Sequence, residues 1–164
     1  MLSRLASTPI DRIASLSPDS RNYPTPKVDV RAAVIRDDKI LLVKEKNNGR
    51  WTLPGGFAEI GFSAAENAVK EVQEEAGINV RASALYSVRH KAKGSFPPDV
   101  RDFYKLYFLC ERIDDAALAA GSETLDAAYF APDALPELCT DRVLPEDIER
   151  AFMYRKLPSR VYFD

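Results

Sequence analysis

Apolar and β-branched residues gather in short runs along the chain, separated by turn-forming residues, which predicts several β-strands. Residues 28–35 and 39–45 form the first two runs. Asp37 and Asp38 between them are typical of a tight turn, so we predict a β-hairpin. The other predicted extended segments are 51–53, 80–90, 103–113 and 126–130.

The helical pattern is clearest at residues 64–76, where small and aliphatic side chains share one stripe at about 100° per residue. Ser63 is a good N-cap, and Glu66 completes a capping box with it. Gly77 is placed to end the helix in a left-handed conformation. Two shorter helices are predicted at 132–138 and 145–155.

The balance of these elements defines the expected fold class. Strands outnumber helices and most neighbouring strands can pair antiparallel, which favours an α+β fold or a mixed α/β sandwich. A length of 164 residues suits one domain with its own core. We predict an N-terminal extension at residues 1–23, which contains prolines, and one domain at 24–164.

Composition and charge exclude several classes of protein. Apolar residues make up 46% and charged residues 29%, with a formal net charge of -2, so we expect neither nucleic acid nor a membrane surface as partner. Cys110 and Cys139 belong to no metal-binding pattern, which predicts neither zinc nor a disulfide framework and favours the cytoplasm. No apolar run approaches the roughly 20 residues of a membrane span. The N-terminus also lacks the apolar core of a secretory signal.

Three glutamates crowd one face of the predicted 64–76 helix. Glu71, Glu74 and Glu75 are neighbours because positions i, i+3 and i+4 adjoin on a helix, and each like-charge pair costs roughly 0.2–0.5 kcal/mol. A solvated helix tolerates this cost, so the helix alone leaves a simple exposed acidic face open. The preceding Gly55 and Gly56 let the backbone approach a ligand.

Carboxylates combined with backbone carbonyls are the ligands that Mg2+ prefers, and bound Mg2+ is commonly shared with substrate phosphates. The pattern therefore predicts a metal-dependent site for a phosphate compound.

These residues resemble the Nudix box, G-x5-E-x7-R-E-U-x-E-E-x-G-U, in which U is aliphatic. The positions that match in register are Gly56, Glu71, Val72, Glu74, Glu75, Gly77 and Ile78. Phe62 stands in place of the first glutamate, and Lys70 replaces the arginine, which keeps a cation without the bidentate fork. The wider sequence, about residues 24–155, resembles bacterial Nudix pyrophosphatases that act on ADP-ribose and CDP-choline.

The resemblance implies a mixed β-sheet between helices and hydrolysis of the diphosphate linkage of a nucleoside diphosphate derivative. It also implies a homodimer and a Mg2+ or Mn2+ cofactor. The metal ligands it implies are Glu71 and Glu75, Glu74 as a third or bridging ligand, and a backbone carbonyl of Gly55 or Gly56. Two alternatives remain open: a Nudix-fold module that senses an ADP-ribose-like ligand, and house-cleaning of damaged nucleoside triphosphates.

The remaining site residues are candidates. Glu123 lies just before a predicted strand and matches a downstream glutamate of the family, Glu59 can compensate for Phe62, and Glu74 is a third acid with a possible catalytic role. Trp51, beside the glycine loop, is expected either to pack beneath it or to stack on a base. The cations that can hold phosphates, or simply lie at the surface, are Arg31, Lys44, Lys46 and Lys105.

Overall fold

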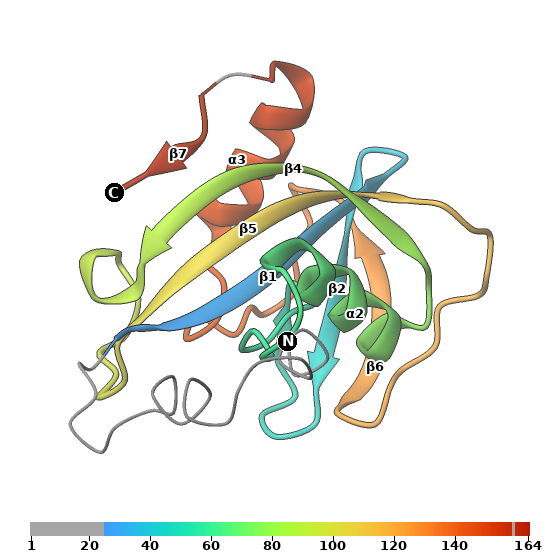
Figure 1. The fold of residues 1–164 in the computed structure, drawn as a ribbon. Coiled ribbons are helices and arrows are strands. Elements are labelled where there is room, and N and C mark those ends of the chain that lie inside the picture. Colours follow the sequence, from blue (N-terminus) through green and yellow to red (C-terminus); the bar gives the residue numbers. More distant parts are fainter. Residues whose placement is uncertain (1–24, 159) are drawn as a thin grey trace, which may run out of the picture.

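The computed structural model describes residues 25–158 and 160–164, so the predicted extension at 1–23 lies outside the described residues. The described elements, labelled in Figure 1, are β1 (Lys27–Arg36), β2 (Lys39–Glu45), β3 (Trp51–Thr52), α2 (Ala64–Ala76), β4 (Val80–His90), the 3-10 helix η2 (Lys91–Lys93), β5 (Phe103–Arg112), β6 (Thr124–Phe130), α3 (Pro145–Lys156) and β7 (Tyr162–Phe163).

The strands form one mixed sheet, with the order β3-β2-β1-β5-β4-β7 and β6 paired to β2. β1 and β5 run parallel, whereas β4 pairs antiparallel with β5, and β2 with β6. Helices α2 and α3 lie on opposite sides of the sheet, as Figure 1 shows. Val72 of α2 belongs to one buried cluster and Ile148 of α3 to the other. The predicted fold class, a mixed α/β sandwich, is confirmed.

The predicted hairpin is present at its turn, but its strands soon diverge. Asp37 and Asp38 have φ angles of 51° and 54°, as in the two-residue turns that match the twist of paired strands. In the register of β1 with β2, two residue pairs lie opposite each other, Ile35 with Ile40 and Arg36 with Lys39. Beyond this point β2 continues beside β6, so an edge of β1 is left for another partner.

That partner is the segment that contains the glycine pair. The amide of Ala32 donates to the carbonyl of Pro54 at 2.9 Å, and the amide of Val30 donates to the carbonyl of Gly56 at 2.8 Å. Ala58 donates to Val28 at 2.8 Å in the same way. Because buried backbone groups need partners, these bonds hold the glycine segment against β1.

The helix predictions are correct in two cases and wrong in one. α2 has the predicted bounds, the capping box of Ser63 and Glu66, and a left-handed Gly77 with φ 71°. The predicted helix at 132–138 is absent. Pro136 lacks an N–H group and would disturb such a helix. The segment instead runs beside β3, where Trp51 donates to the carbonyl of Glu137 at 3.0 Å.

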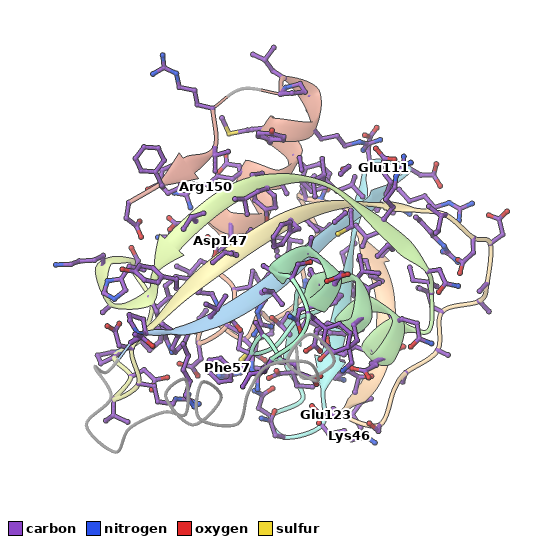
Figure 2. All side chains as sticks on the ribbon, in the orientation of Figure 1. Lys46, Phe57, Glu111, Glu123, Asp147 and Arg150 are labelled. Carbon is purple, nitrogen blue, oxygen red and sulfur yellow. The ribbon has the colours of Figure 1, made fainter. Side chains whose placement is uncertain are left out.

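A buried carboxylate fixes α3 on the sheet. Asp147 is fully buried at the start of α3 and accepts hydrogen bonds from Arg89 of β4 at 2.7 Å and Tyr107 of β5 at 3.0 Å. It also accepts from the amide of Leu144 at 2.9 Å. Asp147 and Arg150, both of α3, are labelled beside β4 and β5 in Figure 2. A buried charge of this kind depends on its partners.

Replacing Asp147 with alanine should lower the free energy of unfolding by roughly 3 kcal/mol, because Arg89 would lose a buried counter-ion. Urea denaturation followed by circular dichroism measures this change. The matched control is Glu149→Ala, an exposed position on the same helix, which should stay within about 0.5 kcal/mol of the wild type. An equal effect of both variants would contradict the structural role of Asp147.

Candidate active site

The glycine pair lies directly against two glutamates of α2. The amide of Gly55 donates to the carboxylate of Glu75 at 2.9 Å. A Cβ atom on Gly55 would lie 2.0 Å from the carbonyl oxygen of Val30, and one on Gly56 would lie 2.7 Å from Oε1 of Glu71. Gly55 therefore requires glycine, because the backbone of β1 leaves no room for a side chain, whereas a side chain at position 56 would displace the Glu71 carboxylate.

Two cavities meet at these glutamates, and both are lined by Glu71, Glu75 and Glu123. The first, of about 330 Å³, is lined by five cationic side chains as well as five carboxylates, and we call it the basic cavity. Its cations are Arg31, Lys91, Arg101, Lys105 and Arg142. The second, of about 350 Å³, we call the acidic cavity, and its remaining lining residues are Glu59, Lys70, Glu74 and Ser122.

Burial raises the pKa of two of the shared glutamates, Glu71 and Glu75, because it disfavours their charged form. Desolvation raises the pKa of Glu75 to about 7, and the negative charge of Glu71 adds to the effect, although the Gly55 amide and Arg31 oppose it. Desolvation also raises the pKa of Glu71, with Glu74 contributing in the same direction. Among the described residues, the Glu71 carboxylate makes no hydrogen bond or ion pair. These carboxylates suit a bound cation, which would offset their desolvation.

The wall of the basic cavity contains a buried group of three charges. Arg31 donates to both carboxylate oxygens of Asp29, at 3.1 and 2.6 Å, and Lys105 is ion-paired to the same carboxylate. All three side chains are almost fully buried. Desolvation and the neighbouring Arg31 lower the pKa of Lys105 to about 8. One carboxylate faces two cations, so the wall carries an excess positive charge that suits a phosphate group.

Lys70 forms ion pairs with two of the acids that the sequence predicted for the site. Its ammonium binds the carboxylate of Glu59 at 3.0 Å and that of Glu74 at 2.9 Å. Both glutamates line the acidic cavity, and only Glu71 and Glu75 of the three box glutamates reach both cavities. Glu59 is thus a partner of Lys70, the residue that replaces the box arginine.

Glu123 lies at the junction of the cavities, and its carboxylate makes no hydrogen bond or ion pair within the part of the chain that is described. Lys46 lines neither cavity. Its amide donates to the carbonyl of Glu123 at 3.2 Å, and its ammonium donates to the carbonyl of Ser122 at 2.5 Å. Figure 2 shows Lys46 and Glu123 next to each other. In the structure, Lys46 supports the segment that carries Glu123.

The structure does not bring Lys44 and Trp51 to either cavity. Trp51 packs edge-on against Phe130, with ring centroids 4.7 Å apart, and the Lys44 ammonium lies 6.0 Å from the Trp51 ring centre. Trp51 is thus partly buried and packs against the core cluster on the α3 side of the sheet.

Three cations of the basic cavity were not identified from the sequence. Lys91 and Arg101 come from the two ends of the segment between β4 and β5, and Arg142 precedes α3, where it pairs with Glu45 at 2.6 Å. The unusual length of the segment before β5 was the available signal, since long loops in compact domains are often functional. No local pattern marks Arg142.

The donor set of the site fits a divalent cation only in part. Within residues 25–158 and 160–164, no group of three or more His, Cys, Asp and Glu side chains converges closely enough to hold a metal ion. Two half-buried carboxylates are present, and backbone carbonyls and phosphate oxygens are ordinary further ligands. The carbonyl of Gly56 accepts from Val30, whereas no backbone amide of the described residues donates to the carbonyl of Gly55. Gly55 therefore offers the less occupied oxygen.

Comparison with known proteins identifies the family. Residues 25–150 match the NUDIX domain. The chain belongs to the Nudix family, whose hydrolases generally use divalent metal ions. The chain is 41% identical over 160 residues to "Putative ADP-ribose pyrophosphatase YjhB" of Bacillus subtilis (strain 168), which covers 98% of this chain and 76% of that protein.

Two solved structures are similar throughout. The crystal structure of an ADP-ribose pyrophosphatase from Streptococcus suis 89-1591 has a TM-score of 0.78 at 35% identity and covers 85% of this chain and 100% of its own. The crystal structure of a UDP-X diphosphatase has a TM-score of 0.84 at 32% identity and covers 100% of this chain and 79% of its own. Across the described residues, no helix has both the length and the apolar character that a membrane crossing requires.

The raised pKa of Glu75 gives the apoprotein a pH-dependent stability. Between its ordinary value of 4.5 and about 7, the folded protein holds a proton that the unfolded chain has released, so stability falls as pH rises through this window. In EDTA at pH 8, Glu75→Gln should raise the free energy of unfolding by roughly 1–3 kcal/mol. Chemical denaturation at pH 5 and pH 8 measures it, with Glu149→Gln as an unaffected control. A lower free energy of unfolding for Glu75→Gln than for the wild type at pH 8 would contradict this explanation of the pH dependence.

Proposed function

We propose that this protein hydrolyses the diphosphate linkage of a nucleoside diphosphate derivative, such as ADP-ribose or CDP-choline, to a nucleoside monophosphate and a phosphorylated partner. The predicted enzyme class, a Nudix pyrophosphatase, is confirmed by the family match and by the relative from Bacillus subtilis. The observation that carries the proposed reaction is the position of Glu71 and Glu75 behind Gly55 and Gly56, where two cavities meet.

The cofactor we propose is Mg2+ or Mn2+, held by the carboxylates of Glu71 and Glu75 and by the carbonyl of Gly55. When bound, such an ion neutralises phosphate charge and lowers the pKa of a coordinated water. Glu74, which is engaged by Lys70, would orient this lysine and add to the negative potential of the site. The raised pKa of both carboxylates, neither of which forms an ion pair among the described residues, supports this assignment.

The substrate phosphates would meet the positive wall of the basic cavity. Arg31 and Lys105 are held rigidly by Asp29, so they need no rearrangement to face a phosphate group. Arg142, which is only partly exposed, would add a further cation. Phosphoryl transfer depends mainly on positioning and on neutralising charge, which these residues supply.

Glu123 is the general base that the geometry favours. Hydrolysis forms a bond from a water oxygen to phosphorus, breaks the P–O–P bridge and releases a proton, which the base accepts. Glu59 and Glu74 are both bound to the Lys70 ammonium, whereas the Glu123 carboxylate faces both cavities with no partner among the described residues. Lys46 holds the backbone of this segment in place.

The two alternatives make different use of the same site. A sensing module would bind ADP-ribose without hydrolysing it, and a house-cleaning enzyme would prefer nucleoside triphosphates. The relatives named ADP-ribose pyrophosphatase support hydrolysis of a diphosphate derivative over both. A homodimer and a cytoplasmic location complete the proposal, and light scattering of the purified protein tests the dimer.

A panel of ADP-ribose, CDP-choline, nucleotide sugars and nucleoside triphosphates, assayed with Mg2+ and with EDTA, tests the function. We expect metal-dependent release of a nucleoside monophosphate from at least one diphosphate derivative. Glu71→Gln should lower kcat/KM by roughly 100-fold or more. The matched control is Gln73→Ala, an exposed position on α2. No turnover of any compound, with ADP-ribose raising the melting temperature, would favour the sensing module instead.

The choice of base is tested separately. Glu123→Gln should lower kcat by roughly 100-fold or more, because general base catalysis contributes about that much. Glu59→Gln should lower kcat by less than about tenfold, since its carboxylate is engaged by Lys70. Steady-state kinetics on the best substrate of the panel measure both. The reverse order of effects would assign the base to Glu59.

A further inference from the structure

The two cavities present different chemistry to the two halves of a diphosphate substrate. The acidic cavity is lined only by charged and polar side chains, and no aromatic ring contributes to it among the described residues. The basic cavity is lined in addition by Phe57 and Phe103. The cavities share three glutamates, so they adjoin at the proposed metal site.

The two phenylalanines form a fixed aromatic surface. Their ring centroids are 5.4 Å apart at an interplanar angle of 86°, an edge-to-face contact. Phe103 is 4% exposed, whereas Phe57 is 39% exposed and retains ring surface that a ligand can cover. The backbone of Phe57 bridges to Asp29, and the following residue is bonded to β1, so the ring stands on a rigid support. In Figure 2, Phe57 lies apart from Glu123, toward β1.

A planar cation accompanies this surface. The guanidinium of Arg101 lies 5.7 Å from the Phe57 ring centre and 6.0 Å from that of Phe103. Two hydrogen bonds to the carboxylate of Asp99, at 3.0 and 2.8 Å, hold the guanidinium in place. The combination of an exposed ring and a fixed guanidinium is typical of sites on which nucleobases stack.

We propose that Phe57, together with Phe103 and Arg101, forms the nucleobase subsite, so that the nucleoside half of the substrate occupies the basic cavity, and the group attached to the second phosphate extends toward the acidic cavity. This inference rests on the proposed function and adds the orientation of the substrate. Stacking needs only a π-face, which every nucleobase has, so the subsite accepts purines and pyrimidines. The lining of the acidic cavity suits a hydroxyl-rich or positively charged group.

Product binding tests the subsite without requiring turnover. Isothermal titration calorimetry with Mg2+ compares AMP with ribose 5-phosphate, which carries the phosphate and ribose but no base. Phe57→Ala should weaken AMP binding by roughly fivefold or more, because alanine removes the stacking surface. The affinity for ribose 5-phosphate should change by less than about twofold. Phe57→Trp, which keeps an aromatic face, should retain or strengthen AMP binding.

The matched control is Phe62→Ala. Phe62 belongs to the same connection before α2 and is 50% exposed, but it lines neither cavity, so both affinities should stay unchanged. Unchanged AMP binding in Phe57→Ala, equal losses for both probes, or no AMP binding by the wild type would overturn the subsite. A protein that binds AMP through Phe57 but hydrolyses nothing would refute only the proposed function.

Discussion

Hydrogen bonds between β1 and the segment after β3 hold the whole candidate site together. β2 leaves β1 soon after the turn, and the carbonyls of Pro54 and Gly56 take its place on the amides of Ala32 and Val30. This pairing presses the glycine pair against α2, where Glu75 accepts the amide of Gly55. Without it, the box glutamates would lie on an ordinary solvated helix face, and neither cavity would have its shared wall.

The three box glutamates, which are neighbours on α2, lie in different electrostatic environments. Glu74 turns to Lys70, which also binds Glu59, so one box glutamate and one loop acid share a single cation at the surface. Glu71 and Glu75 are half-buried and form no ion pair with any residue that the structure describes, and desolvation raises the pKa of both. The departure at Lys70 from the box arginine thus preserves a cationic partner, although the lysine divides its contacts between two carboxylates.

The wall of the basic cavity carries positive charge because of the way Asp29, Arg31 and Lys105 are paired. Asp29 neutralises only one of its two buried cations, and Phe96 packs against Lys105, with the ammonium 5.4 Å from the ring centre. A substrate with a diphosphate between two unlike substituents would therefore meet a positive wall, an acidic junction suited to a cation, and different surroundings at each end. The fold alone does not supply this division, because fold and function are separable. The individual side chains do.

Local sequence determined the elements whose stabilising contacts are close in the chain. The α2 helix, its capping box, its terminal glycine and the register of its glutamates follow from residues at most four positions apart, and so does the tight turn before β2. The Nudix resemblance rested on the same local register.

Tertiary structure decided what depends on distant segments. It paired β1 with β5, joined Lys105 to Asp29 across 76 positions, brought Arg142 and Arg101 to one cavity and kept Lys44 and Trp51 out of it. It also drew residues 132–138 alongside β3 instead of into a helix. The periodicity of apolar residues along the sequence predicts which face of a helix or strand is buried. It does not predict which other element covers that face. Long-range packing and hydrogen bonding settle that choice.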